Sequence, residues 1–392
     1  MGSGFSRLFW VVVGSTFLGF VGIGAIVPLL GPHVKRDLGQ SDLVVGLAIG
    51  IFSVVALTSR LIAGPVTDRK GRKPALIAGL ACCSVSGLAY LLPFGITAVF
   101  TGRILQGLGE AFLFVAAAAW AVEAAPEGRK AQALGFLGAG VWGGLAVGPA
   151  IGAYLGSFEN AALLLVLTPI PAVLALRNAP ETLRERHPLA KAPSVIPRRA
   201  LMPGIVLGFV NVHYPAMAGF LTLHLASTGN AAGGQAFSAY AVVILTSRFF
   251  LGGLPDRIGP RITFYVGLFS MAAGLFVLSL GPGPGMSIFG AALTGFGFSL
   301  PWPSIASTVL NQAPDYERAA SVGLLTACVD LFVGASSFVD GALAHRYGYP
   351  VLYWVAIGSL AIAAVLGVKV TSVKAMPHHD EDAIAEPVAD MA

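Results

Sequence analysis

The chain has 392 residues, of which 56% are hydrophobic and only 11% are charged. A soluble domain carries about a quarter charged residues, so this composition excludes a water-soluble protein and indicates an all-α membrane protein. The net charge of +5 reports basic loops, because the sequence has no signature of nucleic-acid binding. Cys82, Cys83 and Cys328 lie in apolar segments without metal or disulfide spacing, so we expect no metal site and no cofactor.

About twelve apolar segments follow one another, each about as long as a membrane-spanning helix. They cover residues 7–30, 42–66, 74–93, 97–123, 131–156, 161–177, 201–225, 234–254, 262–281, 285–311, 319–343 and 349–370. Ser41 is a suitable N-cap for the second segment, and Gly281 to Gly285 separates the ninth from the tenth. The first segment lacks a signal-peptide cleavage site, so we expect it to remain as a helix.

The loops on the two sides of these segments differ in charge. One side carries only Lys35, Arg36 and Arg346, whereas most other basic residues lie on the opposite side. Positive charge marks the cytoplasmic side, which predicts an inner-membrane protein with both termini in the cytoplasm. We expect a six-helix bundle over 1–177, a cytoplasmic linker over 178–200, a second bundle over 201–372 and a disordered cytoplasmic tail over 373–392.

A polar stretch from Gly64 to Pro74 separates the second and third segments, and its pattern returns later in the chain. Arg248, Gly252, Asp256 and Gly259 follow Arg60, Gly64, Asp68 and Gly71 at one constant offset. Pro314 follows Pro126 at this same offset. A constant offset predicts two halves built on one plan.

The loop Gly64-x-x-x-Asp68-Arg69-x-Gly71-Arg72-Lys73 resembles the signature between the second and third helices of the major facilitator superfamily. The resemblance extends from about Arg7 to Lys369. It implies a monomer with two pseudo-symmetric six-helix halves around a central cavity, working by alternating access.

The resemblance also implies a cytoplasmic gate that latches the outward-open state by pairing Asp68 with arginines and breaks on switching. A static salt bridge is the alternative. Glu123 and Arg129 are expected to pair with Arg69 and Arg72. The gating candidates are Gly64, Asp68, Arg69, Gly71, Arg72, Glu123, Arg129, Asp256 and Arg257.

Charged residues inside the apolar segments are candidates for proton coupling, since a charge within the membrane costs on the order of 3 kcal/mol. Arg103, Gln106 and Glu110 share one helix face and resemble the fourth-helix motif of proton-coupled members of the superfamily. Asp330 lies midway in the eleventh segment. We expect Glu110 and Asp330 to bind protons beside Arg103; a fixed ion pair between the halves is the alternative.

Other polar and aromatic residues are candidates for the substrate cavity. These are Gln106, Trp142, Asn211, His213 and Trp302. His213 has the alternative of a hydrogen bond within the bundle, and the tryptophans have that of simple packing. Asp340 is expected in the outer vestibule.

A glycine stripe marks the fifth segment. Gly144, Gly148, Pro149 and Gly152 resemble the fifth-helix motif of antiporters, although Ala153 stands where the motif has a second glycine. The alternative is close helix packing. The first helix carries no acidic residue, unlike that of many proton-coupled drug exporters.

These features predict proton-coupled export of a small amphipathic molecule. The alternative is a proton symporter or facilitator for uptake of a sugar or organic acid, with Arg103 on the carboxylate. The partners are then a small-molecule substrate, protons and the lipid bilayer, without nucleic acid. No nucleophile elbow or phosphate loop is found, so we expect no enzyme.

Overall fold

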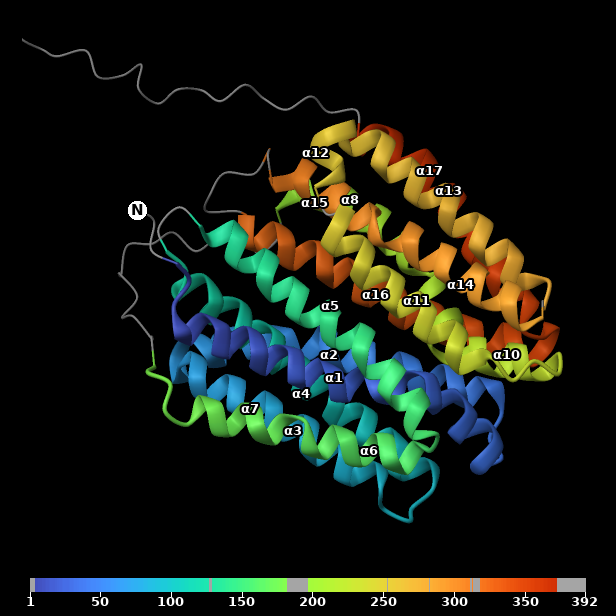
Figure 1. Ribbon diagram of the computed structural model, residues 1–392, viewed down its shortest axis with the longest axis horizontal. Coiled ribbons are helices and arrows are strands. Elements are labelled where there is room, and N and C mark those ends of the chain that lie inside the picture. The colour runs from blue at the N-terminus through green and yellow to red at the C-terminus, as the bar shows by residue number, and fades with distance from the viewer. Residues whose placement is uncertain are drawn as a thin grey trace, which may run out of the picture.

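The computed structural model describes residues 4–126, 129–181, 197–251, 253–281, 283–310, 312 and 318–371. Within these ranges the chain forms long helices that lie side by side, with the first half in blue to green and the second in yellow to red (Figure 1). The predicted tail over 373–392 and most of the predicted linker lie outside the described residues.

The first half contains six spans. They are α1 (Arg7–Pro32) continued by the π-helix η1 (His33–Asp37), α2 (Asp42–Lys70), α3 (Arg72–Tyr90), α4 (Ile96–Glu123), α5 (Lys130–Leu155), and α6 (Phe158–Leu167) with α7 (Pro169–Leu176). Thr168 separates α6 from α7, and Pro169 begins α7, where its missing N–H leaves no unpaired donor.

The second half repeats this arrangement. Its elements are α8 (Arg198–Asn211), α9 (His213–Pro215), η2 (Ala216–Phe220), α10 (Leu221–Ser227), α11 (Gly233–Leu251), α12 (Leu254–Ile258), α13 (Pro260–Ser279), α14 (Pro284–Ser299), α15 (Pro301–Leu310), α16 (Arg318–Tyr347) and α17 (Pro350–Thr371). Helices α8 to α10 form one span, which passes through the π-helical turn η2 directly after Pro215.

The number of spans agrees with the prediction of about twelve helices. Eleven helical segments of the described residues are long and apolar enough to cross a membrane. The remaining predicted segment, 285–311, is divided at Leu300 into α14 and α15, because Pro301 cannot donate to the helix. Ser41 is the N-cap of α2 as predicted, but its side chain makes no capping hydrogen bond.

The buried apolar residues form two main cores, one centred on each half, and the first continues across the boundary to Phe220 and Leu352 of the second half. In the first half Leu76, Leu113 and Trp120 are fully buried, and in the second half Phe264 and Met271 are. Helices pack closely through small residues, as expected where lipid rather than water surrounds the bundle. The two cores are the physical basis for treating the molecule as two halves.

The halves meet along α2 with α16 and along α5 with α11. We call the end of the bundle that holds Arg7 and Gly71 the terminal face, and the end that holds Asp42 and Gly234 the far face. Near the far face a Cβ on Gly341 of α16 would lie 3.0 Å from Cα of Gly46 on α2. Backbone approach this close requires glycine on both helices.

No such approach is found towards the terminal face at the glycines of the same helices that the structure describes. A Cβ built on Gly64 of α2 or on Gly323 of α16 meets no atom within 4 Å. The same holds for Gly135 on α5 and for Gly253 after α11. The close glycine contacts between the halves therefore lie at the far face.

Candidate functional site

An arginine joins two acidic residues from different halves. Arg60 on α2 places Nη2 at 3.0 Å from Oε1 of Glu110 on α4, and its Nη1 contacts Oδ2 of Asp330 on α16. The ring of Phe114 lies 5.3 Å from the guanidinium carbon. Both predicted proton-binding carboxylates therefore lie at the boundary between the halves, on one cation that the sequence reasoning did not include.

This Arg60–Glu110–Asp330 group is only partly shielded from solvent. The exposed side-chain fraction is 8% for Glu110, 17% for Arg60 and 22% for Asp330. The three charges therefore compensate one another inside the bundle, while their side chains keep some exposed surface.

Arg103 lies apart from this group, in contrast to its expected place beside the two carboxylates. Its Nε donates to the carbonyl of Ala48 at 2.8 Å and its Nη1 donates to Oε1 of Gln106 at 2.8 Å. The Phe52 ring covers the guanidinium at 4.4 Å. Because these contacts occupy the side chain, Arg103 ties α4 to α2 and is not available to a substrate carboxylate.

Gln106 is likewise buried within the first half rather than in a cavity. It is fully buried, and Oε1 also accepts a hydrogen bond from the hydroxyl of Tyr90 at 2.7 Å. Gln106 thus completes the polar contact between α3 and α4 that holds Arg103.

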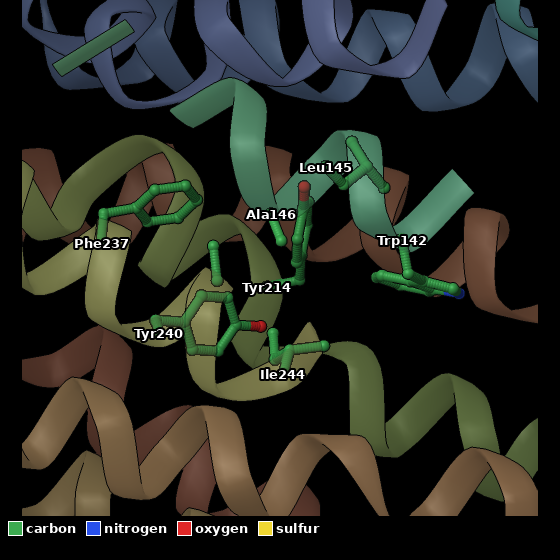
Figure 2. Close-up of a pocket in the computed structure, with 8 residues that line it drawn as sticks. Trp142, Leu145, Ala146, Tyr214, Phe237, Tyr240 and Ile244 are labelled. Carbon is green, nitrogen blue, oxygen red and sulfur yellow. The ribbon is translucent and has the colours of Figure 1, made fainter. Parts of the chain in front are cut away.

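A small cavity lies between α5 of the first half and α11 of the second. Trp142, Leu145 and Ala146 of α5 face Tyr214, Phe237, Tyr240 and Ile244 across it (Figure 2). It encloses about 20 Å³, which is room for about one water molecule. The structure thus brings Trp142 to the boundary between the halves, in a conformation that holds no space for a substrate there.

A larger hollow has a different character. It measures about 340 Å³ and is lined by Leu47, Ile51, Val54, Phe100 and Phe338. Leu47 and Val54 are exposed and none of the five side chains is polar. Such a surface suits lipid chains rather than a polar substrate.

The other residues predicted to line the substrate cavity make their contacts within the second half. His213 is 1% exposed, and its Nε2 lies 3.0 Å from the hydroxyl of Tyr240. It thus holds in place Tyr240, which lines the small cavity, without lining the cavity itself. Asn211 donates to the carbonyl of Leu207 on its own helix. Trp302 packs against the second core. These contacts agree with the bundle-packing alternative, because none of the three side chains lines the cavity.

The second half holds a counterpart of the Arg60 group in which aromatics replace the acids. Arg248 on α11 stacks on Trp142 at 3.9 Å and lies 5.9 Å from Phe298. Arg248 and Phe298 follow Arg60 and Glu110 at the constant offset of the internal repeat, and Asp330 follows Trp142 at the same offset. The internal repeat therefore relates the two groups residue by residue, a signal that the sequence alone carried.

The gating candidates form a network at the terminal face. Arg72 donates to Asp68 at 2.7 Å and to Glu123 at 2.8 Å. These contacts lie within the first half, where they join the ends of α2, α3 and α4, and the breaking of the pairing on switching stays a prediction. Arg69 is exposed, and Arg129 lies over Phe5.

Two further residues complete the network. Glu181 accepts hydrogen bonds from the backbone N–H of Arg72 and Lys73, both at 3.0 Å, at the N-terminus of α3. Gly71 has φ of +109° and Glu181 occupies the space of its missing side chain. The sequence reasoning missed Glu181 because it lies in the linker. Arg257 is exposed on α12, and the side chain of Asp256 lies outside the described residues.

The glycine stripe of α5 packs against α1. A Cβ on Gly144 would lie 2.6 Å from the carbonyl oxygen of Phe17, and one on Gly148 would lie 2.9 Å from the amide of Ala25. Gly152 makes the same approach to Ala25, and Pro149 packs on Gly24. The stripe therefore acts within the first half as a close-packing surface.

Asp340 differs from its expected place in the outer vestibule. It is 1% exposed, and its Oδ2 has no hydrogen-bond partner among the described residues. The hydroxyl of Tyr353 also lacks one. Asp340 turns into the second bundle because the neighbouring Gly341 occupies the contact with α2.

Two curated relatives resemble the chain over most of its length. An uncharacterised MFS-type transporter of Salmonella typhimurium is 29% identical over 376 residues, covering 92% of this chain and 95% of the relative. One from Burkholderia pseudomallei is 28% identical over 377 residues, covering 92% of this chain and 90% of the relative.

Solved structures of transporters share the fold. A POT family transporter in complex with 5-aminolevulinic acid has a TM-score of 0.76 at 12% identity and covers 93% of this chain and 95% of its own. The human organic anion transporter MFSD10 has a TM-score of 0.70 at 17% identity, with 92% and 98% covered. The sequence profile of the Major Facilitator Superfamily matches residues 12–229 and 200–389. With about twelve helical spans among the described residues and this match over nearly its full length, the chain belongs to the major facilitator superfamily and is a membrane transporter.

Proposed function

We propose that the protein couples proton movement to the export of a small amphipathic molecule by alternating access. The observation that carries the proposal is the contact of Arg60 with Glu110 and Asp330, which places two ionisable acids on the boundary between the halves. A protonated acid no longer attracts Arg60 as an ion, so protonation weakens this link between the halves.

The proposed coupling follows from the position of the group. The close glycine contacts between the halves lie at the far face and the three side chains are only partly shielded, so in the described conformation a proton arrives or leaves from the terminal face. When that face closes and the far face opens, the same carboxylates exchange with the other side. Proton transfer across the membrane then supplies about 1.4 kcal/mol per pH unit and about 2.3 kcal/mol per 100 mV.

The proposal includes an orientation in the membrane. The basic loops over Arg69–Lys73 place the terminal face in the cytoplasm of an inner membrane, so both termini are cytoplasmic. The described conformation is then inward-facing. The protein acts as a monomer, because one chain contains both halves that form the boundary with Arg60, Glu110 and Asp330.

The test uses the full chain in proteoliposomes with an imposed pH gradient. A transported compound is first selected by a thermal-shift screen of metabolites and drugs on the purified protein. We expect wild type to move protons and compound together, and Glu110→Gln and Asp330→Asn to retain counterflow of the compound but lose its dependence on the pH gradient. If both variants keep full proton movement, the coupling assignment is wrong.

A second candidate is proton-linked uptake of an organic acid. The observation that favours it is Arg248, which lies at the boundary between the halves without an acidic partner among the described residues. A sugar has no charge to match this cation. In proteoliposomes whose exterior is more acidic, accumulation of a labelled acid would favour proton-linked uptake. Expulsion of the preloaded acid from the same proteoliposomes would favour export in exchange for protons.

A further inference from the structure

The guanidinium of Arg248 is a cation inside the bundle without a counter-ion among the described residues. Its equivalent, Arg60, contacts Glu110 and Asp330, whereas Arg248 contacts Phe298 and Trp142 at the corresponding positions. Aromatic faces attract a cation but accept few hydrogen bonds from its N–H groups. Nε of Arg248 is buried and has no hydrogen-bond partner in the part of the chain that the structure describes.

An unpaired guanidinium inside the bundle would be stabilised by an anion that binds from outside the chain. A charge within a membrane protein is costly unless it pairs or contacts water. The cation–π contact with Trp142 offsets only part of this cost. The donors of the guanidinium fork remain available, and their geometry matches that of a carboxylate.

Arg248 also stands where a substrate would pass. Ile244 and Trp142 both line the small cavity (Figure 2). Arg248 lies one helical turn from Ile244, and its guanidinium stacks on Trp142. Arg248 lies closer to the terminal-face end of α11 than Ile244 does, so the apolar and aromatic cavity wall is on its far-face side. A substrate that enters this cavity from the terminal face therefore meets Arg248 first.

We propose that Arg248 binds the carboxylate of a small organic anion, and that Trp142, Tyr214 and Tyr240 contact the apolar body of that anion. This inference rests on the proposed transport function and names its substrate class. Because the cavity encloses about 20 Å³ in the described conformation, the apolar body enters only as α5 and α11 move apart. Phe298 and Trp142 stand at the positions equivalent to Glu110 and Asp330, so no acid at these two positions opposes the incoming anion.

The experiment measures equilibrium binding to the purified full chain in detergent, by thermal shift and by titration calorimetry. The probes are three matched pairs of an aromatic acid and its neutral amide: benzoate and benzamide, phenylacetate and phenylacetamide, indole-3-acetate and indole-3-acetamide. The variants are Arg248→Gln and Arg248→Lys. Arg261→Gln is the matched control, because Arg261 is exposed on α13, away from the cavity.

We expect at least one acid to bind wild type and Arg261→Gln alike, and at least about tenfold more tightly than its amide. Arg248→Gln should lose about tenfold or more, the factor that corresponds to 1.4 kcal/mol, and Arg248→Lys should fall between. Equal binding of acids and amides, no binding of any acid, or unchanged binding in Arg248→Gln would overturn the proposal. In that case Arg248 and Trp142 form a lock between the halves only.

The two proposals fail separately in these measurements. Binding is read at equilibrium without a pH gradient, so it does not depend on proton coupling. If Arg248→Gln binds normally while wild type still shows proton-dependent flux, the anion assignment alone is wrong. If acids bind through Arg248 but flux ignores the pH gradient, the coupling assignment alone is wrong.

Discussion

Arg60 of the first half contacts Asp330 of the second half, and this ion pair joins the two bundles between α2 and α16. Glu110 shares the same cation at 3.0 Å. One arginine thus compensates two carboxylates that come from different halves. A change in the charge of any one of the three residues alters the balance between the conformations.

Removal of Arg60 should destabilise the protein more than removal of the whole charged group. Arg60→Gln leaves two partly buried carboxylates uncompensated, which we expect to lower the free energy of unfolding by about 3 kcal/mol. The triple variant Arg60→Gln, Glu110→Gln, Asp330→Asn carries no charge there and should recover most of this loss. Thermal denaturation of the purified variants measures both effects. A triple variant as unstable as Arg60→Gln would show that packing, rather than charge, stabilises this region.

Bulky residues at the glycine contacts should shift the conformational balance in opposite directions. Gly46→Leu places a side chain against α16 at the far face, so it should favour the conformation open there. Gly323→Leu has space in the described conformation but obstructs closure of the terminal face, so it should favour the described one.

Distance measurements between spin labels at the two faces check this prediction. Gly358→Leu serves as the control, because Gly358 is exposed on α17 with no atom within 4 Å of a built Cβ. Identical distances in all three variants would contradict the assignment of closed and open faces.

Tyr349 should strengthen the closed far face in a pH-dependent way. Its hydroxyl donates to Oδ1 of Asp42 at 2.9 Å across the halves, and Asp42 also contacts Lys35. Burial raises the pKa of Tyr349 above its ordinary value of 10.0. The folded protein thus holds this proton more tightly than the unfolded chain, so the stability is fully present below about pH 10 and is lost as the pH rises through the raised pKa.

Tyr349→Phe removes the hydrogen bond and should lower stability by about 1 kcal/mol near neutral pH. The extra loss of stability above about pH 10 should disappear in this variant. Thermal midpoints of wild type and Tyr349→Phe over this pH range test both points. A wild-type curve that runs parallel to that of the variant would show that Tyr349 does not titrate with folding.

Asp340 should be a stability defect rather than a stabilising residue. Its Oδ2 is buried without a hydrogen-bond partner among the described residues, whereas Asp42 is paired with Lys35 and Tyr349. We expect Asp340→Asn to raise the free energy of unfolding by about 1–3 kcal/mol, because it removes a carboxylate that the second bundle does not compensate. Asp42→Asn should lower it. If Asp340→Asn instead loses stability, a bound cation or a proton neutralises the Asp340 carboxylate in the folded protein.

Much of the fold followed from the sequence, because lipid leaves few ways to satisfy a backbone. Long apolar segments must be helices there, and the constant offset between the repeated motifs required two equivalent halves. The breaks were less visible. Division of the tenth span at Leu300 depends on where Pro301 falls within an otherwise apolar segment, and apolar composition does not report it.

The sequence by itself determined which residues carry charge inside the membrane: Glu110, Asp330, Arg103 and the repeated pair Arg60 and Arg248. The tertiary structure alone decided which of them meet. Arg103 turned to the α2 carbonyls, Arg60 reached both acids, and Arg248 reached only aromatics. The reason is that helical spacing fixes neighbours on one helix, whereas partners on other helices depend on how closely and at what register the helices pack. That register is set here by glycines such as Gly46 and Gly341.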